Sequence, residues 1–201
     1  MSIYKLKTPI SEEEVRKLRI GDIVYVSGIV ITARDAAHKR ILEYIEKDIA
    51  LPANFNGGVI YHSGPVVRRK DDTWDVISAG PTTSARMELY EADIIEKLGV
   101  RMIVGKGGMG DKTAEACKKH GAVYSIFTGG AGALATKTIK KVVRVEWLDL
   151  GIPEALWIFE VEDFGPLFIA IDSTERSIIK EVVDRAYRKC DEILARLGVK
   201  H

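Results

Sequence analysis

The sequence predicts a mixed α/β fold with parallel and antiparallel strands and a long C-terminal helix. Short, continuously apolar runs at residues 100–104 and 122–127 are typical of strands buried in a parallel sheet. Short β-type runs joined by polar turns between residues 59 and 79 indicate antiparallel pairing. Residues 173–197 carry apolar side chains at helical spacing, which predicts a closing amphipathic helix. Because no repeat, low-complexity run or linker interrupts the chain, we expect a single domain over residues 1–201.

The first half of the chain alternates β-type and helical segments. Residues 1–20 hold a β-type opening and a short helix, in which Ser11 and Glu14 have the spacing of a capping box. Residues 21–31 are apolar and β-like, and residues 32–48 have helical periodicity with Thr32 as the expected N-cap. The segments that follow are a turn-rich stretch at 51–58, a strand at 59–62, a polar hairpin at 68–74 and a strand at 74–79.

The second half continues as helix, strand, helix and strand, and then becomes mainly β. A helix is expected from residue 83, and another over residues 111–120, with Gly121 as its C-cap. The remaining predictions are a small-residue turn and helix start at 129–134, strands at 140–148, 157–161 and 167–171, and the closing helix.

Composition and charge narrow the class of protein. The chain has 46% hydrophobic and 29% charged residues, which is typical of a soluble globular protein. Its net charge of +1, from 30 basic and 29 acidic residues, gives no reason to expect nucleic acid or an anionic membrane as a partner. No apolar stretch approaches the roughly 20 residues that span a bilayer, and the first residues lack the apolar core of a secretory signal. We therefore expect a cytoplasmic protein.

Two glycine-rich turns, at residues 80–86 (GPTTSAR) and 105–110 (GKGGMG), carry the strongest functional signal. A strand-helix-strand unit separates them and returns the chain to its starting side, so both turns should lie at one edge of a sheet. Arg86 lies in a first helical turn, where the helix dipole disfavours positive charge unless an anion binds there. Lys106 lies among glycines and is either a second anion ligand or a mobile surface lysine. Together the turns predict a pocket for a small anion.

Arg34 follows the β-type run at residues 21–31 and could join this pocket, although Asp35 could equally neutralise it. His38, one turn further on, is as well explained by packing as by acid–base chemistry. If Arg34, Arg86 and Lys106 converge, three cations would suit a ligand with two carboxylates, since guanidinium groups pair with carboxylates in bidentate fashion.

A nucleotide site is the main alternative from the residues alone. The second turn matches GxGxxG at Gly105, Gly107 and Gly110, but the next strand does not end in the acidic residue that reads a ribose. The turn also departs from a P-loop, because extra residues precede Thr113. A non-catalytic anion- or nucleotide-binding module therefore stays open as an alternative.

The cysteines give no metal signature. Cys117 and Cys190 stand alone in helical patterns, without a CxxC or Cys/His pair, and are predicted to be small buried thiols. We therefore predict no metal bound by this chain itself.

The chain resembles the β subunit, or C-terminal domain in fused forms, of the iron–sulfur-dependent hydro-lyases, which comprise class I fumarate hydratase and L(+)-tartrate dehydratase. The matching segments are TARDAAHKR, GPTTSARM, GKGGMG with the following DKTAEACKKHGAVY, GGAGAL and VEDFGPLFIAID, in colinear order from about residue 30 to 172. One departure is Ser84-Ala85, where many relatives have Ala-Gly. The resemblance implies a single domain of the swivelling β/β/α type.

The resemblance also implies a carbon–oxygen lyase that is active only with an α subunit, in a hetero-oligomer. Three cysteines of that subunit would bind a [4Fe–4S] cluster, and this chain would bind none. The expected reaction is reversible hydration of fumarate to (S)-malate, a step of the tricarboxylic acid cycle, with L(+)-tartrate dehydration as the alternative. The implied roles are carboxylate binding by Arg34, Arg86 and Lys106, proton transfer by Thr82, further substrate contacts by Thr32 and Thr83, and support from Asp35 and His38.

Overall fold

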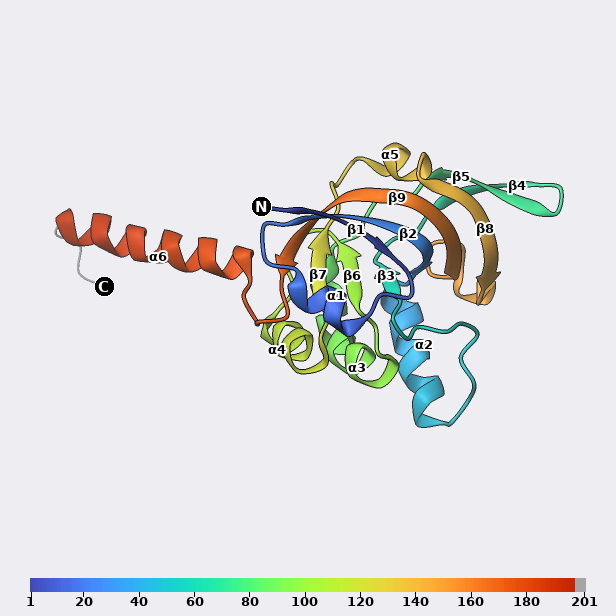
Figure 1. Cartoon of the computed structure of the whole chain (residues 1–201), viewed down its shortest axis with the longest axis horizontal. Coiled ribbons are helices and arrows are strands. Elements are labelled where there is room, and N and C mark those ends of the chain that lie inside the picture. Colours follow the sequence, from blue (N-terminus) through green and yellow to red (C-terminus); the bar gives the residue numbers. More distant parts are fainter. Residues whose placement is uncertain (198–201) are drawn as a thin grey trace.

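A seven-stranded sheet with the order β1-β2-β3-β6-β7-β9-β8 forms the centre of the molecule in the computed structural model, which describes residues 1–197 (Figure 1). Parallel pairing joins β1 to β2, β2 to β3, β3 to β6 and β6 to β7, whereas β9 runs antiparallel to β2, β7 and β8. The strands are β1 (Ile3–Lys7), β2 (Ile23–Thr32), β3 (Val59–Tyr61), β6 (Met102–Gly105), β7 (Val123–Ile126), β8 (Ile139–Glu146) and β9 (Leu156–Ile171). A separate antiparallel hairpin contains β4 (Val66–Lys70) and β5 (Thr73–Ser78). The predicted mixed α/β class is confirmed.

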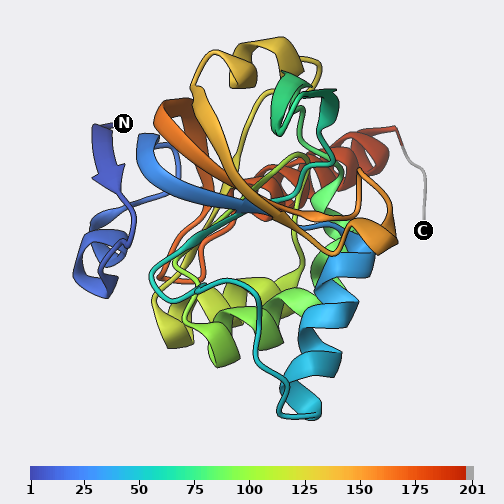
Figure 2. The same ribbon diagram turned by 90° about the vertical axis from the view of Figure 1, so that its right-hand side faces the viewer.

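The helices α2, α3 and α4 lie on one side of the sheet, as both ribbon views show (Figures 1 and 2). The helices are α1 (Glu12–Lys17), α2 (Asp35–Glu46), α3 (Glu88–Leu98), α4 (Asp111–His120), α5 (Gly132–Thr136) and α6 (Ile178–Arg196), with short 3-10 turns η1 (Ser84–Met87) and η2 (Leu148–Leu150). The capping box of Ser11 and Glu14 is present, and Gly121 ends α4 in the left-handed conformation, as predicted. No helix within residues 1–197 is both long and apolar enough to cross a membrane.

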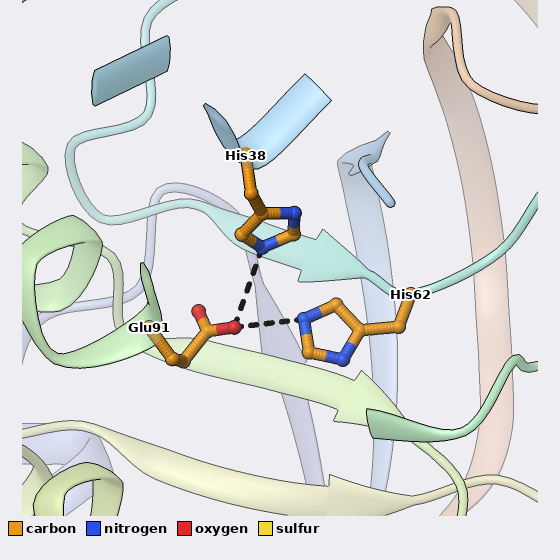
Figure 3. A group of neighbouring side chains, drawn as sticks. All are labelled: His38, His62 and Glu91. Carbon is orange, nitrogen blue, oxygen red and sulfur yellow. Dashed lines mark hydrogen bonds and ion pairs between the residues drawn. The ribbon is translucent and has the colours of Figure 1, made fainter. Parts of the chain in front are cut away.

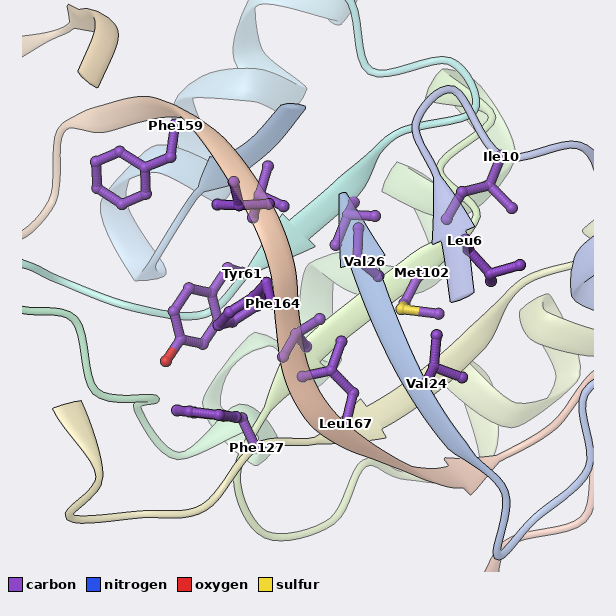
Figure 4. Packing of buried hydrophobic residues seen from close by; sticks show 14 of the residues in the cluster. Leu6, Ile10, Val24, Val26, Tyr61, Met102, Phe127, Phe159, Phe164 and Leu167 are labelled. Carbon is purple, nitrogen blue, oxygen red and sulfur yellow. The ribbon is translucent and has the colours of Figure 1, made fainter. Parts of the chain in front are cut away.

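Two apolar clusters cover the two faces of the sheet, because neighbouring residues of a strand point to opposite sides. In β3, Tyr61 belongs to the cluster shown in Figure 4, whereas Ile60 faces the cluster beneath α2, α3 and α4. Met102 and Ile103 of β6 divide in the same way. Burial on both faces explains why these strands are continuously apolar in sequence. The end of each apolar run therefore marks the sheet edge at which the strand ends.

The two strands predicted at 157–161 and 167–171 are one strand, β9. Gly165-Pro166 lies between the two predicted strands, but β9 continues through it and pairs with β2 on both sides of this point. The pairing shifts register between Val24 and Gly28, and a Cβ at Gly165 would lie 2.8 Å from the carbonyl oxygen of Val24. Glycine therefore permits a close approach at an irregular, bulge-like part of the pairing.

The predicted start of α2 at Thr32 is wrong. Thr32 is the last residue of β2 and pairs with Tyr61 of β3, so its hydroxyl lies inside the fold. The helix begins at Asp35 instead, with Arg34 at the N-cap in an extended conformation. β2 therefore extends further than its apolar run indicated, and Arg34 and Asp35 lie where the chain passes from this strand into α2.

The C-terminal helix α6 is confirmed, but it does not close the fold. It begins at Ile178, after the N-cap Ser177, and projects away from the body of the molecule (Figure 1). None of its residues is buried, and Cys190, predicted to be a buried thiol, is exposed on it. The periodicity of the sequence identified an apolar face but could not show that residues 1–177 leave this face uncovered.

Candidate functional site

Two predicted site residues, Arg34 and Lys106, and a histidine that the sequence did not assign to the site, His62, follow the carboxyl ends of neighbouring parallel strands. Arg34 comes two residues after β2, His62 comes directly after β3, and Lys106 comes directly after β6. Ligand sites of open α/β sheets lie at this edge, because loops from several strands meet there. The topology therefore brings together segments that are far apart in sequence.

Backbone hydrogen bonds join the two glycine-rich turns directly. Thr83 and Lys106 form a parallel bridge, the amide of Lys106 donates to Thr82 O at 3.2 Å, and the amide of Ser84 donates to Lys106 O at 3.0 Å. The amide of Thr82 in turn donates to His62 O at 2.7 Å. The prediction that both turns lie at one edge of the sheet is confirmed.

Gly105 is required by this close packing of the two turns. A Cβ at Gly105 would lie 1.8 Å from Ser84 Oγ and 3.2 Å from His62 Nδ1. The turns could not approach each other with any side chain at this position, so the glycine serves packing and not only backbone freedom.

Arg86 connects three of the predicted residues. Its Nη2 donates to Asp35 Oδ2 at 2.8 Å and to Thr82 Oγ1 at 3.0 Å. The side chains of Arg86 and Asp35 are 45% and 41% exposed, so the group is accessible from solvent. A guanidinium beside the hydroxyl of Thr82 favours negative charge on that oxygen.

The other two cations differ in their surroundings. Arg34 Nε lies 3.2 Å from Glu154 Oε1, and the second oxygen of Glu154 accepts from the amide of Ala36 at 2.9 Å. The ammonium of Lys106 has no hydrogen-bond or ion-pair partner among residues 1–197. Arg34 and Arg86 are thus each paired with a carboxylate, and Glu88 accepts from the amide of Gly110 in the second glycine-rich turn at 2.6 Å. Of the three predicted cations, Lys106 is the one left without a counter-charge within residues 1–197.

The two secondary threonines have different positions. Thr83 is exposed beside Lys106. Thr32 is fully buried, and its Oγ1 accepts a hydrogen bond from the amide of Trp157 at 3.1 Å. The structure therefore brings Arg34, Asp35, Thr82, Thr83, Arg86 and Lys106 to the edge but leaves Thr32 inside the fold.

A buried polar cluster of His38, His62 and Glu91 lies directly behind these residues (Figure 3). Glu91 Oε2 is 2.9 Å from His62 Nε2 and 3.3 Å from His38 Nε2. His62 Nδ1 is 2.9 Å from Ser84 Oγ, which ties the cluster to the first glycine-rich turn. His38, predicted to have a supporting role, thus belongs to a cluster beneath the site.

The sequence reasoning missed Glu91 and the partners of His62. A signal was present, because Glu91 lies four residues after Met87 and three before Ile94, on the buried face of α3. An acidic residue in an apolar helix register needs a buried partner, but its identity depended on the tertiary fold.

Burial and the neighbouring charges set the protonation of the cluster. Burial lowers the pKa of His62 and outweighs the opposing effect of Glu91. Burial would raise the pKa of Glu91, but the charges and hydrogen bonds of the two imidazoles outweigh it and lower this pKa to about 2. Glu91 is therefore ionised near neutral pH, and His62 is a neutral donor to it.

Comparison with known proteins shows the family of the chain. The sequence model of the family described as "Fumarase C-terminus" matches residues 2–182. The chain is 43% identical over 176 residues to "L(+)-tartrate dehydratase subunit beta" of Escherichia coli (strain K12), covering 88% of this chain and 86% of that protein. It is 42% identical over 186 residues to "Putative L(+)-tartrate dehydratase subunit beta" of Methanocaldococcus jannaschii, covering 92% and 95%. It is also 40% identical over 191 residues to "Putative fumarate hydratase class I" of Geobacillus stearothermophilus, covering 94% of this chain and 36% of that protein.

Proposed function

The chain belongs to the fumarase C-terminus family, and we propose that it is the β subunit of a two-subunit hydro-lyase that hydrates fumarate reversibly to (S)-malate. The observation that carries this proposal is the linked group of Arg86, Thr82 and Asp35, with Arg34 and Lys106 at the same sheet edge. Its relatives are named as a dehydratase of L(+)-tartrate and a putative hydratase of fumarate, both of which are small dicarboxylates.

The cations would bind the two carboxylates of the substrate. Lys106 is free of protein partners within residues 1–197, and Arg86 is half exposed, so both can take a carboxylate without losing a buried contact. Arg34 is held by Glu154 and would contribute its remaining guanidinium donors. Binding of both carboxylates fixes the central carbon atoms of the substrate and lowers the barrier by orientation.

Thr82 would hold the proton that is transferred at the carbon next to a carboxylate. A free hydroxyl is a weak base, but Arg86 Nη2 donates to Thr82 Oγ1 at 3.0 Å and stabilises its ionised form. In the hydration direction, water adds its hydroxyl to one alkene carbon and releases its other proton, while Thr82 delivers a proton to the second carbon and is then reprotonated. In the reverse direction Thr82 takes the proton from carbon, and the departing hydroxide gains a proton to leave as water.

The iron–sulfur cluster would belong to the partner subunit. Within this chain Cys117 is buried on α4 and Cys190 is exposed on α6, so the two thiols cannot form a set of three cluster ligands. The partner's [4Fe–4S] cluster would supply Lewis-acid chemistry toward the substrate hydroxyl and carboxylate. Asp35, Arg86 and Thr83 are open to solvent, which leaves room for a second chain over the site.

Helix α6 would provide part of the surface for that subunit. Its apolar residues follow the four-three spacing that suits packing against another helix: Ile179, Val183, Ala186, Cys190, Ile193 and Leu197. The residues that flank this stripe include the basic side chains Lys180, Lys189 and Arg196. A second copy of α6 would present the same basic flanks and offer them no opposite charge, whereas a helix with acidic flanks would. The stripe begins beside the second glycine-rich turn, since a Cβ at Gly108 would lie 3.5 Å from Ile179. A subunit that reaches the site can therefore continue along α6.

Dehydration of L(+)-tartrate is the second candidate. It is favoured by the names of the Escherichia coli and Methanocaldococcus jannaschii relatives. Both substrates carry two carboxylates, so the cations described above serve either reaction.

Anaerobic co-expression with an α-type chain that has three cluster cysteines tests the proposal. We expect a stable complex that turns over fumarate or L(+)-tartrate, with the preferred acid identified by its higher kcat/KM. The isolated chain should have neither activity. If the isolated chain binds ATP or NAD tightly and the complex ignores both acids, the chain is instead a nucleotide-binding module.

A further inference from the structure

His38 has a hydrogen-bonding geometry that neutral imidazole cannot satisfy. Its Nδ1 lies 2.8 Å from the carbonyl oxygen of Arg34, which only accepts hydrogen bonds, so Nδ1 carries a proton. In the neutral ring Nε2 would then be a bare lone pair, 3.3 Å from a carboxylate oxygen of Glu91. Both side chains are fully buried, and His38 Nε2 has no hydrogen-bond partner among residues 1–197. A proton on Nε2 turns this repulsive contact into an ion pair.

The second imidazole has no such conflict. His62 Nε2 donates to Glu91 at 2.9 Å, and its Nδ1 accepts from the hydroxyl of Ser84 at 2.9 Å. This assignment leaves His62 neutral. The additional proton therefore belongs to His38 and Glu91.

Charge balance supports the same assignment. An ionised Glu91 between two neutral imidazoles would leave a net charge of −1 in a fully buried site, which is strongly unfavourable. An imidazolium at His38 makes the cluster neutral overall. Its Nδ1 donates to Arg34 O and Glu91 Oε2 accepts from His62, whereas Glu91 Oε1 has no hydrogen-bond partner among residues 1–197.

The surrounding titratable groups do not supply this charge. Burial raises the pKa of Cys117 on α4 and of Tyr124 on β7, so both stay neutral. Asp35 on α2 is paired with Arg86. Tyr90 on α3 presents its ring to His38, with the ring centroids 6.3 Å apart.

The cluster contacts every segment that carries a proposed substrate ligand. His38 Nδ1 holds the carbonyl of Arg34, and the carbonyl of His62 holds the amide of Thr82 at 2.7 Å. His62 also holds Ser84, which bonds through its amide to Lys106 O and starts the turn that carries Arg86. Glu91 contacts the two imidazoles directly, and it reaches the Thr82 amide only through the main chain of His62.

We propose that Glu91 is a positioning residue, and that it holds a protonated His38 and a neutral His62 in a charge-neutral buried triad that fixes Arg34 and Thr82. The proposal deepens the hydro-lyase function and rests on it for the roles of these two residues. The protonation of the triad is independent of that function.

A divalent metal ion is the competing explanation for the same atoms, because the ligand atoms of the three residues lie within 4.8 Å of one another. The hydrogen-bond distance between Glu91 and His62 favours a proton. A bound metal would also leave a net positive charge at a fully buried site.

Nuclear magnetic resonance of the imidazole nitrogens in the isolated chain tests the triad. We expect both ring nitrogens of His38, and only Nε2 of His62, to carry protons in spectra recorded near neutral pH. An unprotonated His38 Nε2 would overturn the assignment. So would zinc or iron bound stoichiometrically and removed by a chelator. These measurements need neither partner nor activity, so they stand even if the complex has no hydro-lyase activity.

The substitution Glu91→Gln tests the positioning role, with Glu96→Gln as the control. Glu96 lies on the same helix, is exposed, and pairs with Lys119 at 3.1 Å and His120 at 3.6 Å. We expect Glu91→Gln to return His38 to the neutral form, to speed hydrogen exchange at the Thr82 amide, and to lower kcat of the complex about 10- to 100-fold with little change in KM. The control should change none of these. If the folded Glu91→Gln chain keeps normal kcat and normal Thr82 exchange, the positioning role is excluded. If it does not fold, the wild-type spectra still decide the protonation.

Discussion

Removal of the Arg86 side chain separates the proposed substrate role of this residue from its structural contacts. Arg86 makes an exposed ion pair with Asp35 at 2.8 Å and a hydrogen bond with Thr82 at 3.0 Å. Exposed ion pairs contribute about 0.2–1 kcal/mol to stability because water screens them. Arg86→Ala should therefore leave the chain folded, with only a small loss in free energy of unfolding.

The effect on catalysis should be much larger. A charged hydrogen bond to a carboxylate is worth about 1.5–3 kcal/mol, and each 1.36 kcal/mol is a factor of ten in rate. Arg86→Ala should thus lower kcat/KM about 10- to 150-fold, partly through KM and partly through kcat, because Thr82 also loses its donor. The kcat/KM of Arg86→Lys should lie between the values of the wild type and Arg86→Ala, because one ammonium cannot form the two parallel hydrogen bonds of a guanidinium.

The assay is steady-state hydration or dehydration by the reconstituted complex, with thermal unfolding of each variant chain measured in parallel. Arg68→Ala is the matched control, because Arg68 forms another exposed pair, with Asp75 at 3.5 Å, on the hairpin of β4 and β5. A value of kcat/KM for Arg86→Ala that matches the Arg68→Ala control would refute the carboxylate role. A loss of fold specific to Arg86→Ala would show that its contacts are structural.

Substitutions at Thr82, Gly105 and Val183, with comparison variants where the chain offers them, test other parts of the structure. Thr82→Ala should lose about 10²- to 10⁴-fold in kcat, whereas Thr82→Ser should retain most of it, in the same steady-state assay; full activity of the alanine variant would remove Thr82 from proton transfer. Gly105→Ala should lower the free energy of unfolding by about 1–3 kcal/mol in urea titrations, because its Cβ would lie 1.8 Å from Ser84 Oγ. Gly80→Ala, whose Cβ has no neighbour closer than 3.6 Å, should be tolerated, and equal losses would contradict the packing argument. Val183→Glu on the exposed stripe of α6 should weaken binding of the α subunit in titration calorimetry without unfolding the chain, and unchanged affinity would show that the stripe is not an interface.

The sequence predicted those features that depend on local pattern and chain direction. The buried strands β6 and β7 follow from short apolar runs, and the meeting of the two glycine-rich turns follows from a strand-helix-strand connection. Arg86 was predicted to lie in a first helical turn, but it lies in the 3-10 turn η1 before α3 and pairs with Asp35, so its role toward an anion stays a prediction.

The features that were missed depend on contacts between distant segments. Gly165 lies between the two segments that were predicted as separate strands. Only the close approach of its backbone to Val24 of β2 shows that one strand continues. Thr32 was assigned to a helix because the end of a strand leaves no periodicity of its own. Glu91 and His62 are 29 residues apart, so no local pattern could show that they are bonded.

The openness of the site gives a physical reason why a second subunit would be needed for activity. Two unit charges 4 Å apart attract each other by about 1 kcal/mol in bulk water but by about 4 kcal/mol at the lower effective dielectric near a protein surface. Arg86 is 45% exposed, so in the isolated chain water competes for its donors and weakens any carboxylate held there. A chain that covers the edge would exclude this water and strengthen each contact with the substrate without moving a residue. The rigid cluster behind the site then matters more, because Arg34 and Thr82 must already be in place when the second subunit closes.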